Sequence, residues 1–225
     1  MKYKTLFIDL DDTLLDFKAA SHNSLSNLLE GMGIPPSHSL INEFEAINSK
    51  CWRMLEEGEI TREELSKRRF EIFFHALGIK RDPLEANALF RAGLAESAVL
   101  KEGALELCRD LCATNTLCLV TNGFSDTQRS RLKACGLEPF FKYLFISSEV
   151  GYEKPDRRFF LSALKACNGD ARSCLILGDS LSSDIKGGLE SGIDTCWYNP
   201  LGLDGTGYTY MIKELSEFTN IVLSH

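Results

Sequence analysis

The side chains of this sequence that could perform chemistry together lie in four short segments, far apart along the chain. Each segment follows an apolar run and carries carboxylate, hydroxyl, carboxamide or amine groups. The residues are Asp9, Asp11, Thr121, Asn122, Lys154, Asp179 and Asp184. Taken singly, each has an ordinary structural explanation as a turn, a helix cap or a solvated loop. Four such segments in order, each at the end of its own apolar run, favour one shared functional site.

These residue types are suited to phosphoryl transfer. A phosphate monoester repels nucleophiles through its own charge, so a carboxylate can attack it only if a cation neutralises that charge and the geometry is held in line. Mg²⁺ suits this role because it prefers oxygen ligands in octahedral geometry and keeps water and substrate phosphate among its ligands. Asp9 and Asp179 are the natural side-chain ligands for such an ion.

The other residues of the set have roles that follow from their position and charge. Asp11 lies two residues after Asp9 along an extended chain, so its side chain points the same way and can protonate the leaving oxygen and later activate water. That water would hydrolyse an aspartyl phosphate, a covalent intermediate that divides one hard step into two. Thr121 would donate a hydrogen bond to the transferring phosphoryl group, and the Lys154 ammonium would offset the charge of phosphate and of Asp9. Asn122 joins Thr121 and Lys154 as a predicted substrate-binding residue.

Short apolar strands that alternate with helices must position these residues. The first strand is predicted at residues 3–10 and stops at the carboxylates. Further strands are predicted at 116–121, 143–147, 174–177 and 194–198, with helices at 125–135, 156–167 and 182–191. This rhythm predicts an α/β fold, a Rossmann-like parallel sheet with helices on both faces. Functional groups gather at the carboxyl ends of the strands in such a sheet, which is where all four segments fall.

A block of helices separates the first strand from the rest. Apolar residues recur at helical spacing from about residue 18 to 97, with breaks at Gly33, Gly58 and Gly78. Thr61 with Glu64 forms a capping-box pattern, and the Asp-Pro pair at 82–83 opens the last helix. The predicted domains are therefore an α/β core of residues 1–15 and 98–225 and an inserted all-helical cap of residues 16–97.

Composition restricts the class of protein and of partner. The 225 residues are 44% hydrophobic, enough for a buried core. With 25 Lys and Arg against 32 Asp and Glu, the net charge is −7, which gives no basic field for a nucleic-acid polymer. No apolar run is long enough for a membrane span and the first residues are not a cleavable apolar segment, so we expect a cytoplasmic protein that binds a small phosphate monoester and no membrane. The sequence favours no particular oligomeric state.

The eight cysteines contain no Cys-x-x-Cys pair, so they are expected to be reduced residues of the core. Cys108 and Cys112 are four residues apart and could share one helical face. An apolar pair at this spacing packs in a core far more often than it binds a metal, so no metal is assigned there.

The four segments together resemble the motifs of the haloacid dehalogenase-like hydrolases. The matching stretches are DLDDT at 9–13, TNG at 121–123, KPD at 154–156, and GD at 178–179 with Asp184. The resemblance implies that Thr121 and Lys154 hold the phosphate. The helical insertion just after the first motif looks like the small cap of this family, which closes over the substrate and excludes water.

The same resemblance implies the roles of the carboxylates. Asp9 would be the nucleophile and Asp11 the acid and base. Mg²⁺ would be bound by Asp9, by the main-chain carbonyl of Asp11 and by Asp179. Asp184 would stabilise the metal site without binding the ion itself, although in some members of the family the residue at this position is a metal ligand.

Within the family, the chain is most similar to the noncanonical-pyrimidine 5'-nucleotidases. The stretches that carry this likeness are 121–124, 146–151, 194–197, and 48–53 with Arg69. The resemblance implies that the substrate is a nucleoside 5'-monophosphate. A sugar-phosphate or phosphoglycolate phosphatase would use the same core and stays open as the alternative.

Three further interpretations are weaker. A 2-haloacid dehalogenase would lack the aspartate of Asp11 and would not use Mg²⁺. A mutase similar to β-phosphoglucomutase would need a bisphosphate activator, and a binding module without activity would need neither Asp11 nor Lys154.

In the cap, an aromatic face and a planar guanidinium could hold a base or a ribose. The candidates are Trp52, Arg53, Arg69 and Phe70. A Trp in an amphipathic helix more often packs in the core, and the pair Arg68-Arg69 is more often solvated, so none of the four is assigned to the site.

Overall fold

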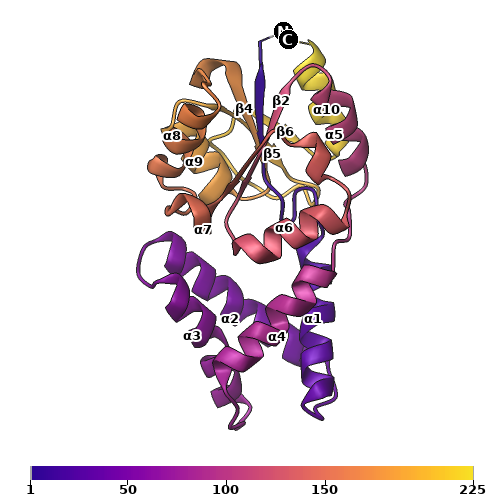
Figure 1. Ribbon diagram of the computed structural model, residues 1–225, viewed down its shortest axis with the longest axis vertical. Helices are drawn as coiled ribbons and strands as arrows, with labels where there is room; N and C mark the ends of the chain where they lie inside the picture. Colours follow the sequence, from indigo (N-terminus) through magenta and orange to yellow (C-terminus); the bar gives the residue numbers. More distant parts are fainter. Residues whose placement is uncertain (1, 225) are drawn as a thin grey trace. The chain divides into compact units, whose positions relative to one another are not determined.

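The computed structural model describes residues 2–224, and the chain divides into two compact units (Figure 1). One unit is Met1–Phe17 with Ala98–His225, and the other is Lys18–Ser97. The chain passes from the first unit to the second after residue 17, two residues later than the predicted boundary at 15. The reason is that the segment after the first strand stays bound to the sheet unit: the Asp16 amide donates to the Val99 carbonyl at 2.9 Å, and Leu15 forms a bridge with Leu100.

A six-stranded sheet forms the first unit, and all five of its strand pairings are parallel. Its strands are β1 (Thr5–Ile8), β2 (Thr116–Thr121), β3 (Tyr143–Ile146), β4 (Cys174–Gly178), β5 (Asp194–Tyr198) and β6 (Tyr210–Ile212). The spatial order is β3-β2-β1-β4-β5-β6. The chain therefore builds outward from β1 in one direction and then returns to build outward from β4 in the other. In open parallel sheets a ligand site lies at such a reversal, outside the carboxyl ends of the strands.

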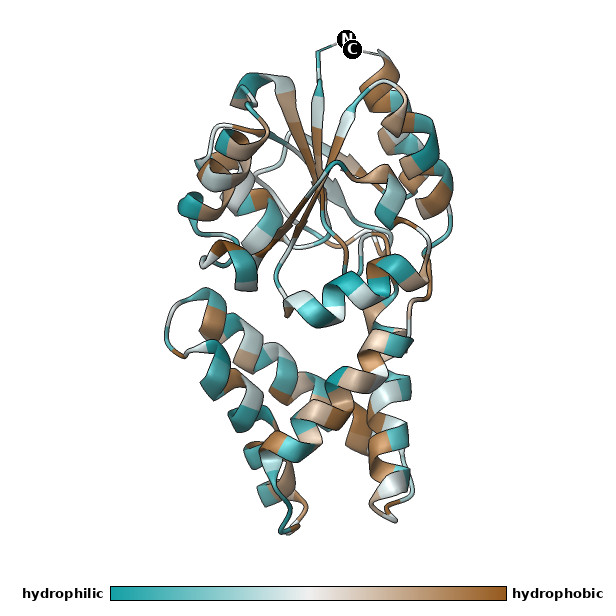
Figure 2. Cartoon of the chain, viewed as in Figure 1, coloured by the Kyte–Doolittle hydropathy of each residue, from teal (hydrophilic) through white to brown (hydrophobic). Residues whose placement is uncertain are grey.

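Helices cover both faces of this sheet, which confirms the predicted fold class. Side chains of β1 alternate between the faces: Leu6 and Ile8 join one apolar cluster and Phe7 joins the other. The first cluster packs against α5 (Ala104–Cys112) and α10 (Leu215–Ser224), and the second packs against α8 (Arg157–Ala166). Figure 2 shows the hydrophobic strands between more hydrophilic outer helix faces.

The remaining helices of the first unit are short. They are α6 (Ser125–Ala134), α7 (Ser147–Val150), α9 (Lys186–Glu190), two 3₁₀ turns at Glu138–Phe140 and Ala171–Ser173, and a π-helical turn at Leu181–Ile185. The predicted helix at 182–191 is thus wrong in its first turn, which is π-helical. α5, α7, β6 and α10 have no counterpart among the predicted elements; the other predicted strands and helices are confirmed with small shifts at their ends.

The second unit is all helical, with α1 (Phe17–Gly31), α2 (His38–Glu56), α3 (Arg62–Ala76) and α4 (Pro83–Glu96). The capping box is confirmed: Thr61 accepts from the Glu64 amide and the Glu64 carboxylate accepts from the Thr61 amide. Asp82 caps α4 through the Leu84 amide at 2.8 Å. Four phenylalanines from three helices form the centre of this unit. They are Phe44, Phe70, Phe73 and Phe90.

Arg69 corrects one expectation, because it is buried and not solvated. Its guanidinium donates to the side-chain oxygens of Asn48 at 2.8 Å and of Asn87 at 2.6 and 3.0 Å. It also lies 5.0 Å from the ring centre of Phe90. Arg69 therefore binds α2 to α4 through neutral partners, as a structural residue of the cap.

The cysteines are all unpaired thiols, as predicted, but they are not all core residues. Cys108 is buried in the apolar cluster on the face of the sheet that carries Leu6 and Ile8, whereas Cys112 is exposed. The two therefore do not share a buried face. None of the helices within residues 2–224 is both long and apolar enough to cross a membrane. The cytoplasmic location stays a prediction.

Two glycines of the cap give opposite predictions for stability. A Cβ at Gly93 on α4 would overlap the hydroxyl of Ser24 on α1, and Ser24 is held in place because it donates to the Phe90 carbonyl at 2.6 Å. A Cβ at Gly31 would meet nothing within 4 Å. We expect Gly93→Ala to destabilise the protein by about 1–3 kcal/mol through overpacking.

The matched variant Gly31→Ala should stabilise the protein by about 0.5–1 kcal/mol, because alanine loses less backbone entropy on folding. Urea unfolding followed by circular dichroism measures both. Equal effects of the two substitutions would show that the two helices do not approach each other at Gly93.

Candidate active site

The predicted site residues follow the carboxyl ends of the central strands. Asp9 comes directly after β1, and its amide donates to the Leu177 carbonyl of β4 at 2.9 Å, which continues the strand pairing by one residue. On the other side Ile8 is in register with Leu119 of β2. Pairing with a neighbouring strand on both sides therefore fixes the position of the Asp9 carboxylate along the strand direction.

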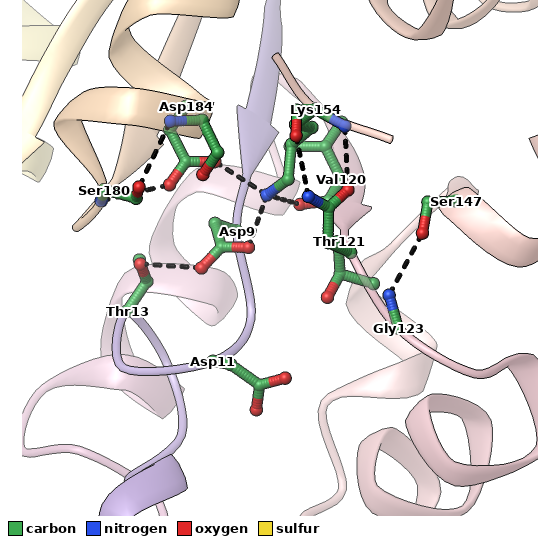
Figure 3. Close-up of polar contacts among 12 residues, drawn as sticks. Asp9, Asp11, Thr13, Val120, Thr121, Gly123, Ser147, Lys154, Ser180 and Asp184 are labelled. Carbon is green, nitrogen blue, oxygen red and sulfur yellow. Dashed lines mark hydrogen bonds and ion pairs between the residues drawn. The ribbon is translucent and has the colours of Figure 1, made fainter. Parts of the chain in front are cut away.

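Lys154 is the centre of the site, and its ammonium is almost completely buried. It lies 2.7 Å from Asp9 Oδ1 and 2.6 Å from Asp184 Oδ1, and it donates to the Val120 carbonyl at 2.9 Å (Figure 3). All three hydrogens of the ammonium thus have an oxygen partner. The two carboxylates supply the charge that makes burial of this cation tolerable.

Asn122 holds the backbone of Lys154. Its carboxamide nitrogen donates to the Lys154 carbonyl at 2.8 Å, and its oxygen accepts from the Lys154 amide at 2.8 Å. These contacts give Asn122 a positioning role for the lysine loop. Its predicted contact with substrate stays a prediction.

The second oxygen of Asp9 accepts a hydrogen bond from Thr13 Oγ1 at 3.0 Å, and Thr13 is itself buried. With Lys154 on Oδ1 and Thr13 on Oδ2, the carboxylate of Asp9 has one fixed orientation. No role for Thr13 is predicted from the sequence. The available signal was its place in the first motif, four residues after Asp9.

Asp179 and Asp184 complete a group of carboxylates with Asp9. One oxygen from each of the three residues can be chosen so that all lie within 4.8 Å of one another. The π-helical turn after β4 directs Asp184 back toward the strand, where its Oδ2 accepts from the Ser180 amide at 3.2 Å. A Cβ at Gly178 would overlap the Asp184 side chain, so glycine is required at the end of β4.

The charges in this group do not balance, because three carboxylates face one ammonium. Burial raises the pKa of Asp9 to about 7, and the neighbouring Asp184 adds to the effect while Lys154 opposes it. Burial, Asp9 and Asp184 raise the pKa of Asp179 well above its ordinary value. Burial lowers the pKa of Lys154, but Asp184 and Asp9 outweigh it, so that the lysine stays charged. An excess of negative charge on oxygen-only ligands is the environment that fits a hard divalent cation.

Asp11 lies beside this group and is bound by α6. Arg131 forms an ion pair with Asp11 Oδ1, and Gln128 Nε2 donates to Asp11 Oδ2 at 2.8 Å. The same Gln128 nitrogen donates to Thr121 Oγ1 at 2.8 Å. Neither α6 residue is predicted from the sequence; the available signal is two polar side chains three residues apart that lie on one face of a helix.

The structure thus collects the predicted residues at one edge of the sheet. Asp9, Lys154, Asp179 and Asp184 form one cluster. Asp11 and Thr121 are joined to each other through Gln128. The catalytic and metal-binding roles assigned to them stay predictions.

The comparisons with known proteins agree on one family. Residues 3–192 match the family model of the haloacid dehalogenase-like hydrolases. The HAD-hydrolase YfnB of Bacillus subtilis is 38% identical over 225 residues, covering 98% of this chain and 96% of YfnB. The crystal structure of YfnB bound to magnesium superposes with a TM-score of 0.93, covering 99% of each chain.

Two further relatives are pyrimidine 5'-nucleotidases. The pyrimidine 5'-nucleotidase PynA of Streptococcus pneumoniae is 35% identical and aligns with 91% of this chain and 87% of its own length. The pyrimidine 5'-nucleotidase YjjG of Escherichia coli is 31% identical, and the alignment covers 100% of both chains.

The charge excess predicts that Mg²⁺ stabilises the fold in a pH-dependent way. Because burial raises the pKa of Asp9 to about 7 and also raises the pKa of Asp179, the stability that these two groups contribute without metal is complete below about pH 4 and is lost as the pH rises through their raised pKa values. If Mg²⁺ binds here, its ligands are the ionised carboxylates, so we expect it to raise the unfolding temperature more at pH 7.5 than at pH 5.5. At about 100 times its Kd the gain is about 2.7 kcal/mol, or several degrees.

Differential scanning calorimetry with and without Mg²⁺ measures this shift. Asp179→Asn should remove most of it, whereas Asp110→Asn, an exposed position on α5, should leave it unchanged. A shift that is the same at both pH values, or that survives Asp179→Asn, would place the ion elsewhere.

Proposed function

The chain belongs to the haloacid dehalogenase-like hydrolases, and from this premise we propose that it is a Mg²⁺-dependent phosphatase that hydrolyses pyrimidine nucleoside 5'-monophosphates through an aspartyl phosphate. The observation that carries the proposal is the buried Lys154, which joins the carboxylates of Asp9 and Asp184 at the carboxyl edge of the sheet. A nucleophilic carboxylate that is fixed, and that has a cation beside it, is what attack on a phosphate ester requires.

The reaction has two steps in which the bonds are exchanged at phosphorus. First an oxygen of Asp9 forms a bond to phosphorus, the ester P–O bond breaks, and Asp11 gives its proton to the leaving oxygen. Then Asp11 removes a proton from water, whose oxygen attacks phosphorus, and the bond to Asp9 breaks. Inorganic phosphate and the free nucleoside are the products, and both aspartates return to their initial states.

Lys154 and Thr121 serve both steps. The ammonium of Lys154 offsets charge on the phosphoryl oxygens while it holds Asp9, and the Thr121 hydroxyl donates to the same oxygens. The residues that would hold Mg²⁺ are Asp9, Asp179 and the main-chain carbonyl of Asp11, with Asp184 in support. When bound, the ion neutralises charge on the phosphate so that a carboxylate can approach it.

The substrate class rests on the likeness to PynA and YjjG, both pyrimidine 5'-nucleotidases that align with most or all of this chain. A leaving nucleoside is an alkoxide-type group of low acidity, which needs a proton as it departs. The second carboxylate, Asp11, supports a reaction with that requirement.

The first test is phosphate release from a panel of esters. We expect Mg²⁺-dependent hydrolysis that is fastest with pyrimidine nucleoside 5'-monophosphates, slower with sugar phosphates and phosphoglycolate, and absent with a chelator. A malachite-green assay of released phosphate measures all three classes. A sugar phosphate at the top of the ranking would keep the mechanism and replace the substrate, and no release from any ester would refute the function.

The second test concerns the two aspartates. Asp9→Asn keeps the shape of the side chain and removes the nucleophilic oxygen, so turnover should fall by more than about 10⁴-fold. Asp11→Asn should slow the reaction by about 10²–10⁴-fold, because it removes a general acid and base. Asp110→Asn serves as the exposed control and should keep full activity. Rapid quench with ³²P-labelled substrate should trap labelled protein with Asp11 intact and none with Asp9→Asn; near-normal turnover of Asp9→Asn contradicts the mechanism.

A further inference from the structure

One face of α6 buries long polar side chains, at positions where a helix usually buries apolar ones. Gln128 and Arg131 lie three residues apart on this face, and both are almost fully buried. Burial of an arginine and a carboxamide costs free energy unless each finds partners. The partners of these two side chains therefore indicate why polar residues occupy this face.

Both side chains converge on the carboxylate of Asp11. Arg131 Nη1 pairs with Asp11 Oδ1, and Gln128 Nε2 donates to Asp11 Oδ2 at 2.8 Å. Each oxygen of the carboxylate thus has its own donor from α6. The guanidinium also lies 5.7 Å from the ring centre of Phe17, which limits its movement from another side.

The orientation of the Gln128 carboxamide follows from its neighbours. Its oxygen accepts from Arg131 Nη1 at 3.3 Å, so its nitrogen must face Asp11 and Thr121. The two hydrogens of that nitrogen are then both used, one on Asp11 Oδ2 and one on Thr121 Oγ1. Because the Thr121 oxygen accepts this bond, its own hydrogen remains to be donated to a phosphoryl oxygen.

The backbone of the TNG segment at 121–123 leaves space for the Gln128 side chain. A Cβ at Gly123 would lie 2.8 Å from Gln128 Cγ and 2.9 Å from Gln128 Nε2. The Gly123 amide donates to Ser147 Oγ at 3.1 Å, which holds the segment in this close approach. Glycine after Asn122 is therefore required for Gln128 to reach Thr121.

We propose that Gln128 and Arg131 are positioning residues that hold the Asp11 carboxylate and the Thr121 hydroxyl as one hydrogen-bonded unit. This rests on the proposed phosphatase function. The unit fixes the acid and base relative to the phosphoryl oxygens, so that one helix sets the geometry of two groups from different strands. A misplacement of about 1 Å at such a group can cost on the order of 10²-fold in rate.

The neighbouring Arg129 provides a matched control on the same helix. It forms a two-pronged ion pair with Glu149 at 2.8 and 2.9 Å, and both side chains are substantially exposed. Arg129 therefore binds α6 to α7 without contact to Asp11. Arg129→Met and Arg131→Met remove the same group from positions two residues apart.

The experiment compares kcat/KM for two leaving groups, the best nucleotide of the panel and p-nitrophenyl phosphate. For the nucleotide, Arg131→Met should lower kcat/KM by about 10²-fold and Gln128→Leu by about 10-fold, with Arg131→Lys between Arg131→Met and wild type. For p-nitrophenyl phosphate, whose leaving group departs without a proton, the loss caused by Arg131→Met should be at least about fivefold smaller. Gln128→Leu should keep part of its loss on this substrate, because Gln128 also holds Thr121. Arg129→Met should match wild type on both substrates.

A double-mutant cycle separates positioning from general stability. If Arg131 acts through Asp11, then adding Arg131→Met to Asp11→Asn should change kcat/KM by less than about twofold. Multiplicative losses, or equal losses on the two substrates, overturn the proposal. If Arg131→Met does not fold by circular dichroism, Arg131→Lys, which keeps a positive charge beside Asp11, decides by the same criteria. Failure of wild type to release phosphate from either ester refutes the phosphatase function itself, whereas an active wild type with unaffected α6 variants refutes only the positioning role.

Discussion

The pair of ionic bonds from the buried Lys154 ammonium to Asp9 and Asp184 is the interaction on which the rest of the site depends. A buried charge without a partner costs several kcal/mol, so none of the three groups could keep its position alone. The two bonds span 145 and 30 residues of sequence, and they join the ends of β1 and β4 to the loop after β3. Asp179 adds a third carboxylate that this ammonium does not neutralise. The same interaction thus fixes the nucleophile and leaves charge for a cation.

This arrangement depends on the order of the strands. Because β1 lies between β2 and β4, its carboxyl end is flanked on one side by Thr121 and on the other by the turn that carries Asp179 and Asp184. The π-helical turn and the absence of a side chain at Gly178 let Asp184 turn back onto the strand end. A regular α-helical turn, or any larger residue at 178, would move this carboxylate away from Lys154.

Three cationic side chains are buried within residues 2–224, and their partners distinguish their roles. Arg69 has only the neutral carboxamides of Asn48 and Asn87, so burial lowers its pKa to about 9. Lys154 has carboxylates, which raise its pKa above the ordinary value despite burial. Arg131 has the carboxylate of Asp11 together with Gln128. The cation with neutral partners stabilises the cap, whereas the two with carboxylate partners hold the groups proposed for catalysis.

The sequence by itself determined the α/β class, most strand and helix positions, and the residues that gather at the sheet edge, because the period of apolar residues and the polar ends of apolar runs are local properties. Only the tertiary structure decided how those residues are bound. The contact of Lys154 with Asp184, the contact of Thr13 with Asp9 and the two bonds of Gln128 depend on strand order, register and side-chain direction, which no local pattern encodes. β6 has three residues, and its strand character comes from its pairing with β5. Burial of Arg69 reversed the expectation that the pair Arg68-Arg69 is solvated, for the same reason: partners from two other helices, 21 and 18 residues away, made burial of a charge tolerable.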